Sequence, residues 1–338
     1  MVGVKSLASA ISIAIGGSVG REGPIVQIGS AIGSSLGQVF RVSPNRMRVL
    51  VGCGAAAGIA ATFNAPLAGM IFALEIILGE FAIATFSPIV LSAVMATAIS
   101  RHYLGDYPAF LVPEYQLVSL WELIFYAILG LAAGVVAVGF TTTLYKFEDL
   151  FDLWKRPDYL KPIVAGLAIG LLGLAFPWVL GVGYGGINLA LAGQMSWWLL
   201  LMLVGVKIVA TSMTIGGGMS GGIFAPSLFI GAMLGGAYGQ LVHALFPEIT
   251  ASSGAYAIVG MGALVAGTTH GPLTAFLILF EMTGNYKIIL PLMSACILAT
   301  LMASQIKKES IYTLKLIRRG VNIRAGQEVN LLRSLTVE

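Results

Sequence analysis

Apolar runs, separated by short polar or glycine- and proline-rich breaks, fill almost the whole chain. A helix that crosses a bilayer needs about 20 apolar residues, and several of these runs are shorter than that. Lipid offers no hydrogen bonds to the backbone. The end of an interrupted helix at membrane depth must therefore be buried in protein or line a water-filled cavity. The pattern predicts membrane helices, some broken or re-entrant, over residues 4–19, 24–40, 49–63, 66–77, 81–99, 118–144, 162–180, 196–214, 226–246, 255–269, 272–280 and 288–302.

The composition supports an all-α, polytopic membrane protein. Of the 338 residues, 57% are hydrophobic and only 10% are charged. Between Pro162 and Phe280 the only charged side chains are Lys207 and Glu248. No water-soluble surface can be built from such a stretch, and a chain of this length has room for about ten spans.

The formal charge of +4 does not indicate a nucleic-acid partner, because the basic side chains are clustered between apolar runs. Seven Lys and Arg residues lie in the tail at positions 307–338, and a second group is Arg41, Arg46 and Arg48. By the positive-inside rule both regions are expected on the cytoplasmic side. Cys53 and Cys296 lie in apolar runs and predict neither a disulfide nor a metal site.

An internal repeat divides the chain. The sequence NAPLA at 64–68 resembles HGPLT at 270–274, and Glu75 and Glu281 follow the two prolines by nine residues each. Upstream, VGCGA at 51–55 matches VGMGA at 259–263, at a displacement two residues different. Further upstream, a glycine-rich turn precedes Pro24 and another precedes Pro226. Three ordered matches indicate two copies of one helical unit.

The repeat predicts three regions. Residues 1–115 form a first transmembrane repeat, residues 116–306 a second repeat with the final helix, and residues 307–338 a cytoplasmic tail or linker. Only 19 residues precede Gly20, whereas about a hundred residues of the second copy precede its glycine-rich turn. We therefore expect the first copy to lack its opening helices.

The two glycine-proline turns are candidate anion sites. Each opens an apolar helix, and the glycines at 221 and 222 leave the amides of Ile223 and Phe224 free to point outward. A helix N-terminus carries about half a positive charge and binds anions without a cationic side chain. Close helix packing is the alternative use of such glycines.

Glu22 is the candidate gating residue. It is the one acid in the apolar first 70 residues, and an ionisable group at membrane depth is costly enough to indicate function. A carboxylate at the start of the first turn's helix would compete with a transported anion and leave when protonated. The alternative is a carboxylate neutralised by Arg21 at the membrane interface.

The chain resembles the CLC family of chloride channels and chloride/proton antiporters. The resemblance rests on GREGP at 20–24, GIFAP at 222–226, and Asn285-Tyr286 followed by Ile289-Leu290-Pro291. It implies an inverted-repeat fold and a homodimer with one pore in each subunit. It also implies transport of chloride or a similar small anion by a channel or antiporter, with no enzymatic activity and no cofactor or metal besides bound chloride. The site it implies comprises gating Glu22, the anion-binding residues Gly222, Ile223, Phe224 and Tyr286, and the anion-path residues Gly20, Arg21, Gly23, Pro24, Ala225 and Pro226.

The sequence departs from the family pattern at three points. The serine-bearing GSGIP segment expected before Lys5 is absent, and GGMS stands at 217–220 where many relatives have Ser-Gly-x-Pro. Glu75 matches the first of two adjacent glutamates of proton-coupled members, but Ile76 occupies the second position and cannot relay a proton.

Two other functions remain open on the sequence. Gly218-Met219-Ser220-Gly221 fits the GxSG pattern of rhomboid-type intramembrane proteases, with His270 as the partner of Ser220 in a catalytic dyad. A membrane subunit without a pore is the other alternative. The duplication of Glu75 as Glu281 favours a shared structural role for these two acids, such as helix capping, over proton transfer.

Overall fold

The computed structural model describes residues 2–106, 110, 117–155, 157–318 and 320. These residues are helical almost throughout and contain no strand, which confirms the predicted fold class. Short π- and 3-10-helical turns cover Ala73–Leu78, Pro177–Val179 and Tyr286–Ile288. The α-helices are α1 Val2–Ala14, α2 Glu22–Val39, α3 Pro44–Phe63, α4 Pro66–Phe72, α5 Ile83–Leu104, α6 Glu122–Leu153, α7 Leu160–Ala175, α8 Tyr184–Leu191, α9 Trp197–Gly216, α10 Phe224–Leu245, α11 Ser253–Thr269, α12 Pro272–Thr283, α13 Ile289–Ile306 and α14 Thr313–Arg318.

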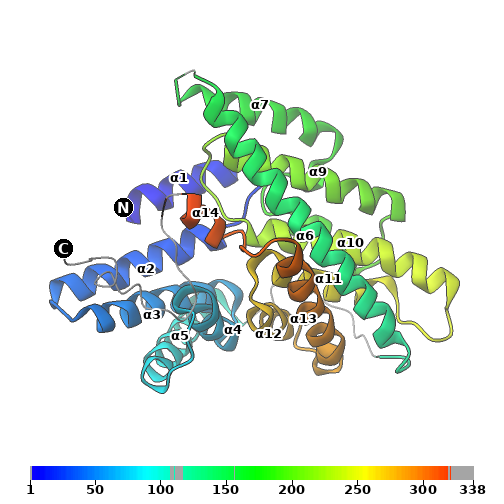
Figure 1. Ribbon diagram of the computed structural model, residues 1–338, viewed down its shortest axis with the longest axis horizontal. Helices are drawn as coiled ribbons and strands as arrows, with labels where there is room; N and C mark the ends of the chain where they lie inside the picture. The colour runs from blue at the N-terminus through cyan, green and yellow to red at the C-terminus, as the bar shows by residue number, and fades with distance from the viewer. Residues whose placement is uncertain (1, 107–109, 111–116, 156, 319, 321–338) are drawn as a thin grey trace, which may run out of the picture.

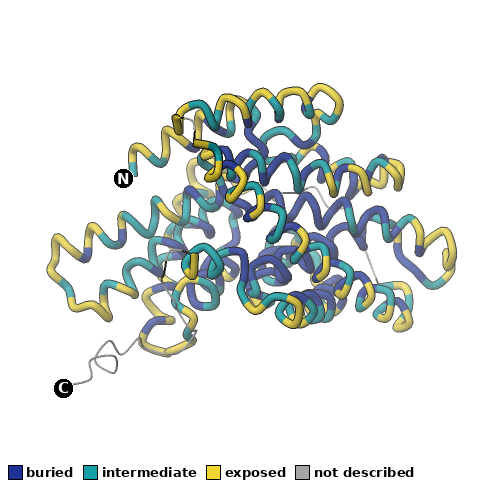
Figure 2. The backbone as a smooth tube through the Cα atoms, turned by 45° about the horizontal axis from the view of Figure 1, so that its top comes forward, coloured by how far each residue is buried: buried dark blue, intermediate teal, exposed yellow. Residues whose placement is uncertain are grey.

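Six helical segments of the described chain are long and apolar enough to cross a membrane. They are α3, α5, α6, α9, α10 and the segment Tyr286–Ile306. The other apolar helices are shorter, and α11 is buried on every side from Gly254 to Thr269. Buried backbone therefore gathers in the middle of the molecule and exposed backbone at its rim (Figure 2). A helix that is hydrophobic all round belongs in such a core, which explains how a 17-residue helix is stable there.

Two helix pairs, one from each repeat, have the same geometry. The backbones of α2 and α3 touch at Gly29 and Gly54, and those of α10 and α11 touch at Gly231 and Gly260. At each of these four positions a Cβ atom would collide with the facing backbone. The pairs lie on opposite sides of the molecule, with α2 and α3 at one end and α10 and α11 at the other (Figure 1).

These contacts fix the register of the repeat. Gly54 and Gly260 each lie ten residues before a residue in the left-handed conformation, Asn64 with φ 57° and His270 with φ 56°. The equivalent glycines are therefore Gly54 and Gly260. The VGxGA motif instead aligns Gly52 with Gly260, which is wrong by two residues. The glycine of α3 that contacts the neighbouring backbone is Gly54.

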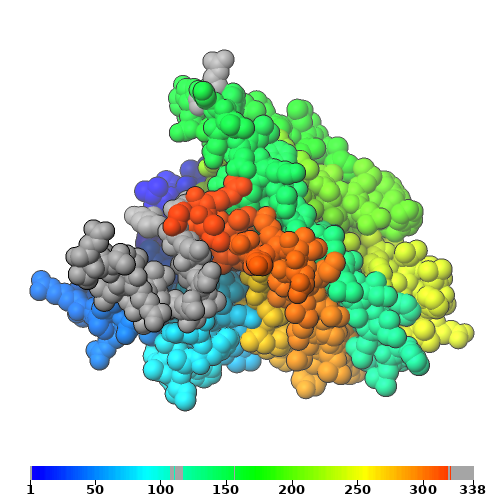
Figure 3. Space-filling model, in the orientation of Figure 1, coloured from blue at the N-terminus to red at the C-terminus, as the bar shows by residue number. Residues whose placement is uncertain are grey.

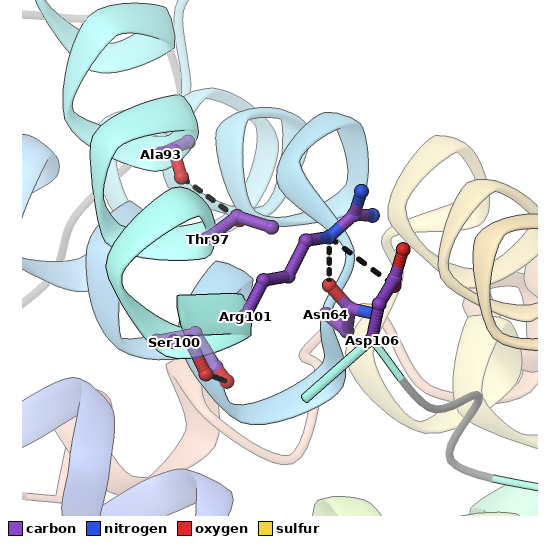
Figure 4. A network of polar contacts seen from close by, with 7 residues as sticks. Asn64, Ala93, Thr97, Ser100, Arg101 and Asp106 are labelled. Atoms are coloured by element: carbon purple, nitrogen blue, oxygen red, sulfur yellow. Dashed lines mark hydrogen bonds and ion pairs between the residues drawn. The ribbon is translucent and has the colours of Figure 1, made fainter. Parts of the chain in front are cut away.

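Asn64 is further held by a polar network at the end of α5 (Figure 4). Its Nδ2 donates to Asp106 Oδ1 at 2.6 Å, and its Oδ1 accepts from Arg101 Nε at 2.6 Å. Arg101 and Asp106 also form an ion pair at 3.3 Å. Asparagine tolerates the left-handed region better than most residues, and this network ties the turn between α3 and α4 to α5.

Glu75 and Glu281 cap each other's repeat. The Glu75 carboxylate accepts hydrogen bonds from the amides of Leu273 and Thr274 at 3.1 and 2.7 Å, at the start of α12. The Glu281 carboxylate accepts from the amides of Leu67 and Ala68 at 3.1 and 2.7 Å, at the start of α4. Carboxylates are stabilising at helix N-termini because they satisfy free amides and complement the dipole. The capping role expected for this duplicated acid agrees with these contacts.

The last described helix, α14, lies across the end of α6 (Figure 3). Lys315 Nζ and Arg318 Nη1 form ion pairs with Glu148 and Asp149, which belong to a charged extension of α6 beyond the predicted apolar run. The Arg318 guanidinium also lies 4.7 Å from the centre of the Tyr145 ring. Residues 321–338 of the predicted tail lie outside the described residues.

We expect Glu75→Gln and Glu281→Gln each to lower the free energy of unfolding by about 1 to 3 kcal/mol, because an amide can replace only one of the two acceptor oxygens. Unfolding in detergent, followed by circular dichroism, measures the change. Glu248→Gln is the matched control, since Glu248 is exposed in the loop between α10 and α11. Equal stability of all three variants would contradict the capping role.

Candidate functional site

The two glycine-rich turns of the repeat meet each other. Gly20 and Gly222 exchange both backbone hydrogen bonds, with N···O distances of 2.8 and 2.7 Å, in an isolated antiparallel bridge. Each is the residue two positions before the first residue of its helix, Glu22 in α2 and Phe224 in α10. Pairing of equivalent residues in antiparallel orientation is what an inverted repeat produces at its pseudo-twofold axis.

The bridge brings two helix N-termini to one place. Neither α2 nor α10 has a side-chain cap, since Arg21 and Ile223 stand at the N-cap positions without side-chain hydrogen bonds to the helix. The first amides of a helix have no partner within it. The partial positive charge of both helix ends is therefore directed at a shared region, and the side chain of Glu22 is the acid in that region.

The Glu22 carboxylate is folded back into this region and is 1% exposed. Its Oε1 accepts a hydrogen bond from the Tyr184 hydroxyl at 3.3 Å, whereas its Oε2 is buried without a hydrogen-bond partner. A Cβ atom on Gly20 would collide with Oε2 and lie 3.2 Å from the Ala225 nitrogen. Glycine at position 20 thus leaves the space in which the carboxylate approaches the first turn of α10.

The neighbouring Arg21 is exposed, and the carboxylate of Glu22 bonds to Tyr184 instead. The alternative of a Glu22–Arg21 pair at a membrane interface therefore does not describe the structure. Burying an acid with one unpaired oxygen costs folding free energy. Such a group in a folded protein therefore calls for an explanation, and a functional role is one.

Most of the site residues expected from the sequence lie together. Glu22 from the first motif faces the turn formed by Gly222, Ile223, Phe224 and Ala225, and Gly23 lies against Gly222, where a Cβ would be 2.9 Å from the Gly222 Cα. Pro24 and Pro226 are each the third residue of their helix. The anion-path residues Gly20, Arg21, Gly23, Pro24, Ala225 and Pro226 thus flank a single region.

Tyr286 is the exception among the expected anion ligands. Its side chain is 72% exposed in the short turn before α13, where its ring packs edge-on against Phe280 at 6.1 Å between centres. The structure does not bring it to the helix N-termini. The assignment of the anion-binding hydroxyl to Tyr286 is corrected for this reason: the turn after α12 ends at the surface of the chain.

A different phenol, Tyr312, lies near the site. It packs against the main core and is close enough for the charge of Glu22 to act on it. The residue before it is held on both sides, since the Ile311 amide donates to Thr268 O at 3.0 Å and the Ile311 carbonyl accepts from Tyr145 at 2.6 Å. Tyr312 was not among the residues expected from the sequence, although the apolar pair Ile311-Tyr312, which follows the charged stretch Lys307-Lys308-Glu309 after the last span, was a usable signal.

Lys207 is the second site residue that the sequence did not assign. It is 0% exposed, and its Nζ donates to Val179 O and Gly181 O at 2.9 and 3.0 Å. The Ser18 hydroxyl also donates to Val179 O, at 2.7 Å. Lys207 is one of only two charged residues between positions 162 and 280. That isolation could have identified it from the sequence, because charged residues within a membrane indicate a function.

The predicted protease dyad is not formed. The Ser220 hydroxyl hydrogen-bonds to the Ser9 hydroxyl at 2.8 Å, while His270 occupies the turn between α11 and α12. Serine held by another serine is not activated by a base. Among the described residues, no group of three or more His, Cys, Asp or Glu side chains is placed to hold a metal ion.

Comparison with known proteins agrees with this geometry. Residues 1–304 match the voltage gated chloride channel family. The chain belongs to this family. With six long apolar helical segments among its described residues, this CLC protein is an integral, multi-pass membrane protein.

Three relatives illustrate the range within the CLC family. The chain is 41% identical to the putative chloride channel protein ClcB-like of Ralstonia nicotianae, over 93% of this chain and 74% of the relative. It is 35% identical to the H(+)/Cl(-) exchange transporter ClcA of Salmonella arizonae, over 93% of this chain and 68% of the relative. A solved slow cyanobacterial Cl-/H+ antiporter superposes with a TM-score of 0.83 at 33% identity, covering 94% of this chain and 76% of the antiporter.

We expect Gly20→Ala to lower the free energy of unfolding by about 1 to 3 kcal/mol, because the new methyl group would collide with the buried Glu22 carboxylate and approach the Ala225 Cβ to 2.9 Å. Thermal unfolding in detergent measures this. Gly205→Ala in α9 is the control, since no atom lies within 4 Å of the Cβ it would add. A Gly20→Ala variant as stable as Gly205→Ala would show that the carboxylate does not occupy this position.

Proposed function

We propose that this CLC protein transports chloride or a similar small anion across the membrane, as a channel or as an antiporter. One observation carries the proposal: two uncapped helix N-termini meet inside an apolar core, and a buried carboxylate lies where they converge. A carboxylate in this place is a stand-in for the anion that the amides would bind. The names of the relatives, a chloride channel and two chloride/proton exchangers, support the same function.

In the proposed mechanism Glu22 blocks and clears the anion path. The charged carboxylate competes with an anion for the positive end of α10. When Oε2, which has no hydrogen-bond partner, takes up a proton, the side chain loses its charge and leaves. The anion then binds the amides of Ile223 and Phe224, and we assign the phenolic donor to Tyr312. Dipoles and neutral donors hold an anion without trapping it, as conduction requires.

The segment around Glu75 lacks the second of the two adjacent glutamates that proton-coupled members of the family carry. Glu75 is engaged by two amides and by the Thr274 hydroxyl, whose Oγ1 lies 2.7 Å from Oε2. Ile76 at the next position has no ionisable group. We therefore propose that any proton coupling depends on Glu22 and not on a second glutamate in this segment.

We also propose that the protein is a homodimer with its C-terminal end in the cytoplasm. The family resemblance supports the dimer. The basic side chains Lys307, Lys308, Lys315 and Arg318, which follow the last spanning helix, support the orientation of the tail.

We expect Glu22→Gln to abolish the pH dependence of anion transport, because glutamine cannot alternate between charged and neutral states. Chloride and proton fluxes measured together in proteoliposomes between pH 4 and 8 test this, with Glu248→Gln as the control. Persistent pH dependence in Glu22→Gln would contradict the gating role. Absence of chloride flux from the unsubstituted protein at every pH would favour the alternative of a non-conducting membrane subunit.

We expect Tyr312→Phe to weaken chloride binding about tenfold, the effect of losing one hydrogen bond to a charged group. Titration calorimetry in detergent measures the dissociation constant. Tyr286→Phe makes the same chemical change at the exposed position. If Tyr286→Phe weakens binding and Tyr312→Phe does not, the anion-binding hydroxyl belongs to Tyr286 after all.

A further inference from the structure

A side-chain hydrogen bond to the Glu22 carboxylate comes from Tyr184, which neither the motifs nor the family resemblance singled out. Tyr184 is the first residue of α8, and its hydroxyl donates to Oε1 at 3.3 Å. A donor to a charged acceptor forms a stronger hydrogen bond than a donor to a neutral one. The contact therefore favours the charged, inward-folded form of Glu22 over the protonated form.

The turn that leads into α8, from Val179 to Gly183, is held in place by Lys207 of α9. Two carbonyls of this turn, Val179 O and Gly181 O, accept hydrogen bonds from Lys207 Nζ. Gly183, the N-cap of α8, has φ +86°, and a Cβ there would lie 2.7 Å from the Phe229 ring and 3.3 Å from Lys207 Nζ. Only glycine fits this position without strain. The turn thus packs closely on α9 and α10 and has little freedom to move.

The ring of Tyr184 is fixed from another side by Phe110. The two rings pack edge to face with their centres 5.0 Å apart, and Phe110 is 2% exposed. A phenol held at its backbone and at its ring presents its hydroxyl in a defined direction. That preorganisation distinguishes a built contact from a chance approach.

We propose that Tyr184 is a positioning residue that holds the charged Glu22 carboxylate in its blocking position and so sets the pH at which the anion path opens. The inference rests on the proposed gating role of Glu22. Among the described residues, four titratable or charged groups act on this carboxylate: Arg21 at the start of α2, Tyr184 of α8, Lys207 of α9, and Tyr312 before α14. From α10 it meets backbone at Ala225.

Tyr184→Phe tests the proposal, because it removes the hydroxyl and keeps the ring that packs on Phe110. The measurement is chloride efflux from proteoliposomes as a function of pH. Without its donor the carboxylate is protonated more readily, so we expect half-maximal efflux to move upward by about one pH unit and efflux at neutral pH to increase. Tyr238→Phe in α10 is the matched control, a partly buried tyrosine that packs on Tyr256 and not on Glu22. We expect it to leave the midpoint unchanged.

The Glu22→Gln background separates this inference from the proposed function. There we expect Tyr184→Phe to have no further effect on efflux, and retained efflux in the double variant shows that the phenylalanine is tolerated. If Glu22→Gln removes pH dependence but Tyr184→Phe leaves the midpoint in place, the role of Tyr184 is refuted while the gate stands. If Glu22→Gln remains pH-dependent, the gate itself is refuted.

Phe110→Leu supplies a second variant, should Tyr184→Phe fail to fold. It loosens the ring of Tyr184 without removing its hydroxyl, so we expect an upward shift of the midpoint smaller than that of Tyr184→Phe. An unchanged midpoint in Phe110→Leu, with the protein folded, would likewise count against a preorganised donor.

Discussion

Every backbone amide and carbonyl inside a membrane needs a partner, and this fold depends on how it meets that need where its helices are interrupted. The chain enters α2 and α10 through turns deep in the protein, and each turn would leave polar backbone unpaired. Gly20 and Gly222 satisfy each other across the interruption. The amides left over point to one region, so the requirement to satisfy the backbone and the proposed anion site have the same structural solution.

A site of this kind binds through partial charges. A full positive charge at the binding position would hold an anion too tightly for rapid release. The nearby lysine is not an exception, because its Nζ is occupied by the carbonyls of Val179 and Gly181 in a turn beside the site. Lys207 thus contributes to the shape of the turn beside the site, and the proposed anion contacts are left to amides and hydroxyl groups.

The helical class, the repeat and the position of a buried acid, Glu22, could be predicted from the sequence because each depends on local or periodic features. Apolar runs define the spans, and Glu22 stands out as a lone acid beside a glycine-proline turn. Tyr286 and Tyr312 could not be ranked in the same way. Both follow apolar helices near the C-terminal end, and only the path of the chain decides which one returns to the core.

Contacts between segments far apart in the chain could not be predicted from the sequence either. The VGxGA motif occurs in both repeats, yet the crossing of the backbones takes place at Gly54 and Gly260, which align only when the left-handed turns at Asn64 and His270 are known. Tyr184 carried no signal within its glycine-rich segment, because its importance comes from the distance between its hydroxyl and a carboxylate 162 positions earlier.

The exchange of Glu75 and Glu281 between the two halves bears on the origin of the fold. Each half contains a helix whose first turn is neutralised by an acid from the other half. Two separate half-length chains related by a twofold axis would make this exchange as a symmetric pair, with each subunit supplying what the other lacks. Gene duplication and fusion would then have converted an interface between subunits into the interior of one polypeptide, and neither half retains the means to complete its own helix.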